Sequence, residues 1–209
     1  MIKAVIFDMD GVLIDAKEWH YEALNRALAL FGFTISRYDH LITFDGLPTR
    51  KKLEMLTREQ GLPAGLHSLI NELKQQYTLE LATTRCRPLF QHEYTLAQIK
   101  SAGLLLGVAS NSVRSSIETM LGKARLLSYF DTIVSNQDVR RPKPDPEMYL
   151  TAAARLGVAP EECLVVEDNH HGITAAEVAG AHVMVVGGIA DVTWPNLQKH
   201  LAVCTLSPC

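Results

Sequence analysis

Five short apolar runs recur along this 209-residue chain, and each one is followed by polar residues or glycine. They occupy residues 4–7, 104–109, 132–134, 164–166 and 183–186. Continuous apolar runs, rather than alternating ones, suit strands that are covered on both faces. Helical patterns separate the later runs, at residues 94–102, 114–121, 147–156 and 172–179. This strand–helix rhythm predicts an α/β fold built on a doubly wound parallel sheet.

One long segment breaks the rhythm directly after the first run. Residues 15–87 read as helical throughout, with apolar residues at near-helical spacing and Gly-Leu-Pro breaks that begin at Gly46 and Gly61. Helices are expected at residues 19–31, 50–56 and 66–81. We therefore expect a small helical domain at residues 15–87, inserted into a core formed by residues 1–14 and 88–209.

Composition excludes several classes of function. The formal charge is −3, with neither a basic stripe for nucleic acid nor a polybasic tail for a membrane. The longest apolar runs fall short of the roughly 20 residues that span a bilayer, and the N-terminus lacks the layout of a signal peptide. Four scattered cysteines form no C-x-x-C pair, and Cys209 is expected to be an exposed thiol. We expect a cytoplasmic protein of undetermined oligomeric state, with a monomer favoured.

Two aspartates end the first apolar run. Asp8 and Asp10 stand at positions i and i+2 of an extended segment, so their side chains point the same way. Both can reach one cation or one phosphoryl group, and Gly11 lets the chain turn sharply beside them. A pair of turn or capping aspartates is the plainer alternative.

Two further polar groups follow later strands. Ser110 and Asn111 end the second run, where a hydroxyl and the amides that open a helix can bind an anion. The same residues could simply cap that helix. Lys143 lies between prolines, which stiffen the backbone and suit a fixed positive charge aimed at an anion. A lysine in a solvated loop is the alternative.

An acidic pair ends the fourth run. Glu167 and Asp168 are costly to leave unpaired beside a core, and a bound Mg²⁺ would compensate them with oxygen coordination. The alternative is a pair of acids that complements the dipole of the helix after Gly172. Together the four groups would stand near the carboxyl ends of parallel strands, where α/β sheets bind ligands. They supply the nucleophile, proton carrier and countercharges that phosphoryl transfer needs.

The pattern resembles the haloacid dehalogenase superfamily, specifically its phosphatase and phosphomutase branch with a helical cap. The family's D-x-D-G-V motif is matched at residues 8–12, and its Ser or Thr after a strand is matched at Ser110. Its lysine in a K-P-x-P context is matched at Lys143. Its acidic pair, followed by glycine and a helix, is matched at residues 167–172. The resemblance covers essentially the whole chain.

The resemblance implies a role for each matched residue. Asp8 attacks phosphorus and becomes an aspartyl phosphate, while Asp10 acts as general acid and then as base. Ser110 and Lys143 bind the phosphoryl oxygens, and Asn111 is a further candidate for substrate binding. Haloacid substrates are disfavoured, because dehalogenases in this superfamily lack an aspartate at the position of Asp10.

The resemblance also implies a metal cofactor. Mg²⁺ would be held by Asp8, Asp168 and the backbone carbonyl of Asp10, with Glu167 supporting the site directly or through water. The expected substrate is a small phosphorylated metabolite such as a sugar phosphate. No nucleotide-binding glycine motif appears, and the surviving nucleophile and metal ligands argue against a regulatory protein that merely kept the fold.

Phosphatase and mutase activities share these motifs, and the cap decides between them. Asp15 and His20 fall where the β-phosphoglucomutase group has an aspartate and a histidine. Arg50, the counterpart of the arginine that holds the distal phosphate in the mutases, comes one residue late, and Lys74 matches their cap lysine only approximately. We therefore expect a phosphoric monoester hydrolase, with the mutase as the alternative.

Other cap and loop residues stay open at this point. Arg50, Lys51 and Lys52 could equally form a solvated helix face, although Arg50 and His20 are candidates for substrate binding, with His20 expected near the entrance of the site. His170 and His171 are expected in a loop beside the metal, where Mg²⁺ would prefer oxygen ligands.

Overall fold

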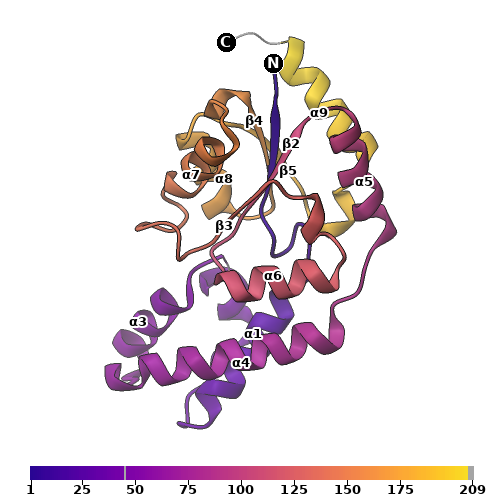
Figure 1. The fold of residues 1–209 in the computed structure, drawn as a ribbon. Helices are drawn as coiled ribbons and strands as arrows, with labels where there is room; N and C mark the ends of the chain where they lie inside the picture. Colours follow the sequence, from indigo (N-terminus) through magenta and orange to yellow (C-terminus); the bar gives the residue numbers. More distant parts are fainter. Residues whose placement is uncertain (45, 207–209) are drawn as a thin grey trace.

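The computed structural model describes residues 1–44 and 46–206, and it is built on one parallel sheet (Figure 1). Its strands are β1 (Ala4–Phe7), β2 (Leu105–Ala109), β3 (Thr132–Val134), β4 (Cys163–Glu167) and β5 (His182–Val185). They lie in the order β3-β2-β1-β4-β5. The chain first builds outward from β1 through β2 to β3 and then returns to the other side of β1. This order confirms the predicted doubly wound α/β fold.

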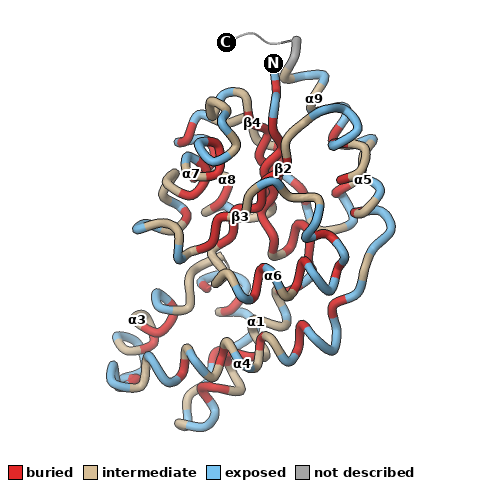
Figure 2. Tube along the Cα trace, viewed as in Figure 1, coloured by how far each residue is buried: buried red, intermediate tan, exposed pale blue. Residues whose placement is uncertain are grey.

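Helices cover both faces of the sheet. They are α5 (Phe90–Ser101), α6 (Arg114–Lys123), α7 (Glu147–Leu156), α8 (His170–Val178) and α9 (Trp194–Leu206). Alternate residues of β1 face opposite ways. Val5 and Phe7 pack with the apolar side chains of α5, α6 and α9, whereas Ala4 and Ile6 pack with those of α7 and α8. The strands are therefore buried on both sides (Figure 2), which explains their continuous apolar runs.

The helices described between β1 and α5, within residues 15–44 and 46–89, form a group of their own, below the sheet in Figure 1. They are α1 (Lys17–Ala29), α2 (Arg37–Asp39), α3 (Thr49–Gln60) and α4 (His67–Arg85), and a π-helical turn covers His40–Phe44. A separate apolar cluster holds this group together, formed by Leu24 and Leu28 of α1, Leu53 of α3 and Ile70 of α4, among others. We call residues 17–85 the helical unit.

Single turns of 3₁₀ helix complete the connections. They lie at Ala64–Leu66, Leu127–Tyr129, Pro160–Glu162 and Ile189–Asp191. The helical unit and the core also touch through α4 and α6, where Ser116 Oγ donates to Gln75 Oε1 at 3.4 Å.

Helices α5 and α8 begin two or more residues earlier than the sequence predicts, at Phe90 instead of residue 94 and at His170 instead of residue 172. The sequence does not mark the start of helix α5 at Phe90, because the first turn has neither a side-chain cap nor an apolar stripe, and Phe90 itself is exposed. Helix α8 starts at His170, where the side chain of Asn169 caps it by accepting from the backbone N–H of Gly172 at 3.0 Å. The expectation that His170 and His171 lie in a loop is therefore wrong.

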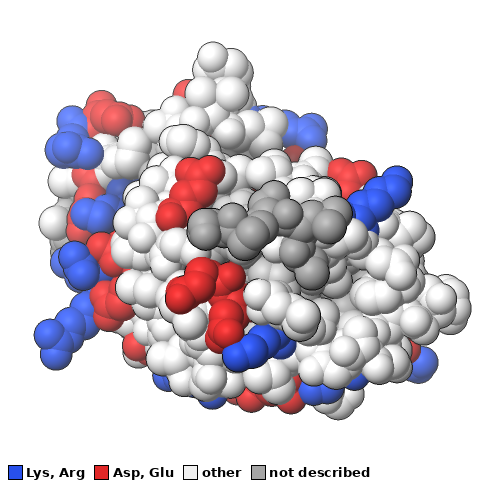
Figure 3. All heavy atoms as spheres, turned by 90° about the horizontal axis from the view of Figure 1, so that it is seen from above, with Lys and Arg blue, Asp and Glu red and all other residues white. Residues whose placement is uncertain are grey.

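Helix length, surface charge and cysteine burial were each the subject of a sequence-based expectation. Within residues 1–44 and 46–206, no helix is long and apolar enough to cross a membrane. On the face seen in Figure 3, acidic and basic side chains are interspersed. Cys163 is buried in β4, and Cys209 lies outside the described residues.

Candidate active site

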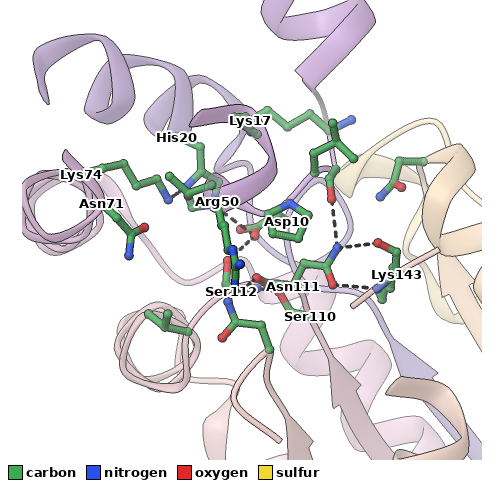
Figure 4. A pocket seen from close by; sticks show the side chains of 18 of the residues that line it. Asp10, Lys17, His20, Arg50, Asn71, Lys74, Ser110, Asn111, Ser112 and Lys143 are labelled. Carbon is green, nitrogen blue, oxygen red and sulfur yellow. Dashed lines mark hydrogen bonds and ion pairs between the residues drawn. The ribbon is translucent and has the colours of Figure 1, made fainter. Parts of the chain in front are cut away.

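Three strands deliver the predicted site to one edge of the sheet. Phe7, the last residue of β1, is in register with Val108 of β2 and with Val166 of β4. The residues that follow these positions, Asp8, Ser110 and Asp168, therefore meet at the same carboxyl edge. Figure 4 shows the groups around the resulting pocket, with Lys143 entering from the loop after β3.

A tight turn after β1 brings its two aspartates over the sheet edge. The backbone N–H groups of Leu13 and Ile14 both donate to the carbonyl of Met9, at 2.9 Å each. Gly11 adopts a φ of +88°, and a Cβ there would lie 2.0 Å from Oδ2 of Asp168. Glycine is thus required by both the turn and the close approach of the β4 carboxylate.

Lys143 is buried between two carboxylates. Its Nζ donates to Oδ1 of Asp8 and to Oε1 of Glu167, both at 2.7 Å. Burial alone would lower the pKa of Lys143, but the charges of Asp8 and Glu167 raise it above its ordinary value. Lys143 therefore stays protonated and supplies a fixed positive charge beside Asp8. The alternative of a solvated loop lysine is wrong.

The carboxylate of Glu167, which pairs with Lys143, has several other close neighbours. Its Oε1 also accepts from the hydroxyl of Tyr149 at 2.7 Å, and its Oε2 accepts from the backbone N–H of Asp168 at 3.0 Å. A Cβ on Gly172 would lie only 1.6 Å from Oε1 of Glu167, so the glycine at this position makes room for the carboxylate. The sequence does not indicate this contact of Tyr149, because an aromatic residue on the buried face of a helix is expected to serve packing alone.

Three carboxylates could hold a metal ion. Asp8, Glu167 and Asp168 each offer an oxygen, and these atoms all lie within 4.8 Å of one another. Burial and the neighbouring carboxylates raise the pKa of Asp8, although Lys143 opposes the rise. Burial likewise raises the pKa of Asp168, although Lys17 opposes it. So much buried negative charge, with oxygen donors alone, fits a hard divalent cation such as Mg²⁺.

Lys17 is a contact of this acidic cluster that the sequence did not suggest. Its Nζ lies 2.8 Å from Oδ2 of Asp168. Lys17 is the first residue of α1, so a cation from the helical unit reaches the acidic end of β4. Asp15, which the resemblance to the mutases singled out, lines a separate hollow with Lys17, Asp168 and Asp191.

Asp10 faces the helical unit rather than the acidic cluster. Its Oδ2 accepts from the hydroxyl of Ser112 at 2.9 Å and lies 3.1 Å from Nε2 of His20. Lys74 of α4 lies 3.1 Å from the other ring nitrogen of His20, and Figure 4 shows the two side chains pointing toward each other. His20 and Lys74 therefore both line the pocket beside Asp10, although the spacing of Lys74 matched only approximately.

These contacts determine the protonation states of Asp10 and His20. Burial alone would raise the pKa of Asp10, but His20, Ser112 and Lys74 hold it below its ordinary value. Burial, assisted by the charge of Lys74, lowers the pKa of His20. At neutral pH this arrangement therefore contains an ionised Asp10 beside a neutral imidazole.

Asn111 connects three segments of the site. Its side-chain N–H donates to the carbonyl of Gly46 at 3.0 Å, and its side-chain oxygen accepts from the N–H of Lys143 at 3.1 Å. Helix α6 is capped by Val113 without a side-chain bond, so the interpretation of Ser110 and Asn111 as simple caps is wrong. Asn111 instead ties the helical unit to the loop that carries Lys143.

A cavity of about 170 Å³ lies between the core and the helical unit. Arg50 lines it, but its side chain is 87% exposed and its Nε donates to Glu54 at 3.0 Å. Lys52 also lines the cavity and is only 8% exposed, so the interpretation of this basic run as a solvated face is wrong for Lys52. His170 and His171 pack near each other, with ring centroids 6.2 Å apart.

Comparison with known proteins assigns the family. Residues 5–186 match the haloacid dehalogenase-like hydrolase family. The chain belongs to that family. A phosphorylated carbohydrates phosphatase from Thermotoga maritima is 32% identical over 182 residues, which are 86% of this chain and 82% of the relative. A β-phosphoglucomutase from Bacillus subtilis is 29% identical over 192 residues, or 89% of this chain and 84% of the relative.

Solved structures agree on the fold. A β-phosphoglucomutase from Clostridium difficile superimposes with a TM-score of 0.86 over 99% of this chain and 100% of the other, at 23% sequence identity. The family match and the curated relatives, not this structure, assign the chain to the phosphatase and phosphomutase branch of the haloacid dehalogenase family, as the sequence motifs predict. The chain is a phosphoric monoester hydrolase or a mutase of that branch.

Proposed function

We propose that this protein is a Mg²⁺-dependent phosphatase that hydrolyses a small phosphorylated metabolite, such as a sugar phosphate, through an aspartyl phosphate on Asp8. The single observation that carries this proposal is the position of Asp8, whose carboxylate lies beside the buried ammonium of Lys143 and within a cluster of metal-binding oxygens. The Thermotoga maritima relative, a phosphatase of phosphorylated carbohydrates, supports the substrate class.

The reaction would proceed in two steps, transfer of the phosphoryl group to Asp8 and its hydrolysis. An oxygen of Asp8 bonds to phosphorus as the bond to the leaving oxygen breaks, and Asp10 gives that oxygen a proton. Water then attacks phosphorus, the bond to Asp8 breaks, and Asp10 takes the proton from water. Asp10 must therefore bind a proton before the first step, and the negative charge of a bound phosphoryl group raises its affinity for one.

Other residues would support this chemistry. Lys143 and the hydroxyl of Ser110 would bind phosphoryl oxygens, and Glu167 would hold Lys143 in place. Asp8, Asp168 and the backbone carbonyl of Asp10 would hold Mg²⁺, which neutralises charge on the phosphoryl group when bound. Since both oxygens of Glu167 already accept hydrogen bonds, we assign it to positioning rather than to direct metal coordination.

The helical unit would serve as a cap over the site. We propose that the cap comprises residues 15–87 and the catalytic core residues 1–14 and 88–209, supported by the separate apolar cluster of α1, α3 and α4. We further propose that the enzyme is cytoplasmic, because its scattered cysteines suit a reducing environment.

The experiment is phosphate release from a panel of sugar phosphates and phosphoglycolate, with Mg²⁺ or with EDTA. We expect metal-dependent release on a few members. Asp8→Asn should abolish turnover while circular dichroism and melting temperature show an intact fold. Turnover by Asp8→Asn would overturn the mechanism, and no release from any compound would count against the phosphatase.

A β-phosphoglucomutase-type activity is the second candidate. The contacts from Asp10 to His20 and from His20 to Lys74 favour it, because they place a cap lysine in the site as the mutase group does. The exposed position of Arg50 disfavours it. Incubation of β-glucose 1-phosphate with a trace of its 1,6-bisphosphate distinguishes the two: glucose 6-phosphate with little free phosphate would identify the mutase.

A further inference from the structure

Tyr149 of α7 is buried beside Lys143, the lysine that contacts the proposed nucleophile. Its side chain is 1% exposed. Lys143 lines the cavity, whereas Tyr149 and Glu167 are not among the described residues that line it. Tyr149 therefore does not touch a group bound in the cavity, and any effect that it has on the reaction must pass through its neighbours.

The hydroxyl of Tyr149 donates to a carboxylate of the site. Its acceptor is Oε1 of Glu167 at 2.7 Å, and the same oxygen accepts from Nζ of Lys143 at 2.7 Å. A buried tyrosine hydroxyl needs a hydrogen-bond partner, and a backbone carbonyl would be enough. Here the partner is instead the carboxylate that holds Lys143, although a phenylalanine would fill the same space with no hydroxyl to satisfy.

Glu167 accepts five hydrogen bonds from the described part of the chain. Lys143 and Tyr149 donate to Oε1, whereas the backbone N–H groups of Asp168 and Asn169 and the side-chain amide of Asn169 donate to Oε2. A carboxylate has about four lone-pair sites, so the hydrogen-bonding capacity of Glu167 is fully used. Its orientation is therefore fixed, and its negative charge is shared among several donors rather than directed at Lys143 alone.

The ring of Tyr149 restrains the ammonium from another side. Nζ of Lys143 lies 4.6 Å from the centre of the ring, within the range of a cation–π interaction. A lysine ammonium is a point charge on a flexible chain, so a single contact does not fix its position. Asp8 and Glu167 accept from two of its three N–H donors, and the third can donate to a phosphoryl oxygen in the cavity.

We propose that Tyr149 is a positioning residue, which fixes the ammonium of Lys143 beside Asp8 through its hydroxyl on Glu167 and its ring beside Nζ. For the reaction that this lysine serves, the inference rests on the proposed function. Without the hydroxyl, Oε1 of Glu167 loses a donor and attracts the ammonium more strongly. Lys143 then shifts toward Glu167 and away from Asp8, and a displacement of about 1 Å is enough to slow a reaction.

The first test is the effect of Tyr149→Phe, which removes the hydroxyl and keeps the ring. For the panel compound that is hydrolysed fastest, we expect kcat to fall about tenfold while KM stays within about twofold, because a preorganised charge acts mainly in the transition state. Tyr149→Leu removes the ring as well and should lower kcat further. The matched control is Tyr129→Phe, which removes a tyrosine hydroxyl from the turn Leu127–Tyr129 and should leave both constants unchanged.

The second test asks whether the loss passes through Lys143. Tyr149→Phe added to Lys143→Met should lower kcat by less than about threefold, since the group to be positioned is then absent. Circular dichroism at the assay temperature checks that each variant is folded. A full tenfold loss in the Lys143→Met background, or wild-type kcat in Tyr149→Phe, would overturn the inference.

The position of the ammonium can also be measured without turnover. Proton–nitrogen NMR detects a buried, hydrogen-bonded lysine ammonium, and the resonance of Lys143 is identified by its loss in Lys143→Arg. Tyr149→Phe should shift this resonance, and Tyr149→Leu should shift it further because the ring current is lost. Tyr129→Phe should leave it in place. A Lys143 resonance that is unchanged in both Tyr149 variants would refute the positioning role.

The two proposals fail separately. A shifted Lys143 resonance in Tyr149→Phe, without phosphate release by the wild type from any panel compound, would remove the phosphatase and leave the positioning of Lys143. Phosphate release by the wild type, with the same kcat and the same Lys143 resonance in both Tyr149 variants, would remove the role of Tyr149 and leave the phosphatase.

Discussion

Nζ of Lys143 lies 2.7 Å from Oδ1 of Asp8, across 135 positions of the chain. The same nitrogen lies 2.7 Å from Glu167, and all three side chains are buried. Buried charges of this kind are tolerated only when each one has a partner. The fold therefore fixes a positive charge at the proposed nucleophile before any substrate arrives, and it depends on that charge for its own stability.

Lys143→Met should lose both activity and stability. Phosphate release should fall by about 100-fold or more, since a preorganised charge beside the phosphoryl group is removed. The free energy of unfolding should fall by about 3–5 kcal/mol at neutral pH, because two buried carboxylates lose their cation. Urea unfolding and steady-state assays measure the two effects. The exposed Lys199→Met should match the wild type, and activity within threefold of wild type in Lys143→Met would contradict the assignment.

Gly172→Ala should be strongly destabilising, although alanine is the better helix former. The new Cβ would stand 1.6 Å from Oε1 of Glu167, which is fixed by Lys143 and Tyr149. A loss of about 2 kcal/mol or more in the free energy of unfolding is expected. Gly122→Ala in α6 is the matched control, because a Cβ there meets nothing within 4 Å, and it should stabilise by up to about 1 kcal/mol. Equal effects of the two substitutions would show that Glu167 can move aside.

Metal binding should respond in opposite directions to two substitutions. Asp168→Asn removes a proposed ligand and should weaken Mg²⁺ binding by about tenfold or more. Lys17→Met removes an ammonium that lies 2.8 Å from the same carboxylate, so Mg²⁺ should bind several-fold more tightly. Titration calorimetry with Mg²⁺, in the absence of substrate, measures the Mg²⁺ affinity of both variants. Weaker Mg²⁺ binding by Lys17→Met would mean that the lysine supports the metal site instead of competing with the ion.

Lys74 should make stability depend on pH. Its pKa is lowered from 10.5 to about 7, chiefly by burial and then by Lys52. Between these values the unfolded chain binds a proton that the folded protein does not. The free energy of unfolding should therefore rise with pH from about 7 upward, by at most about 1.4 kcal/mol per pH unit, and this contribution should be lost as pH falls through 7.

Urea unfolding at pH 7 and pH 8.5, without phosphate or substrate, measures this slope. Lys74→Met should flatten it relative to the wild type, whereas the exposed Lys51→Met should not. An unchanged slope in Lys74→Met would show that Lys74 keeps its proton in the folded protein.

The sequence predicted the sheet and the polar groups at its carboxyl edge because both depend on local pattern. A strand buried on two faces needs a continuous apolar run, and polar residues such as Asp8 and Ser110 mark where it stops. The same pattern could not reveal the burial of Lys52, since buried and solvated lysines within a basic run look alike until α3 is placed in the folded helical unit. Lys74 and His20, 54 residues apart, meet only through the packing of α4 on α1.

Tyr149 and Lys17 were missed for related reasons. Tyr149 lies on the inner face of α7, where an aromatic residue is expected for packing alone, and its hydroxyl bond to Glu167 is a tertiary contact. Lys17 is the first residue of α1, and a lysine at the start of a helix is expected to be solvated. The tertiary contacts of side chains that fit an ordinary local pattern could thus not be predicted, whereas polar side chains that interrupt an apolar pattern were identified from the sequence.

The division of the apolar core into separate clusters has a consequence for how such enzymes diversify. The proposed bond-making groups are fixed to the sheet, whereas Lys52 and Lys74 belong to helices that pack around a cluster of their own. Substitutions in the helical unit, away from Lys17 and His20 with their contacts to Asp168 and Asp10, should therefore alter which compound is accepted more than they alter the reaction itself. Exchange of residues 15–87 for the corresponding segment of a relative would be a direct way to transplant one enzyme's preference onto another's chemistry.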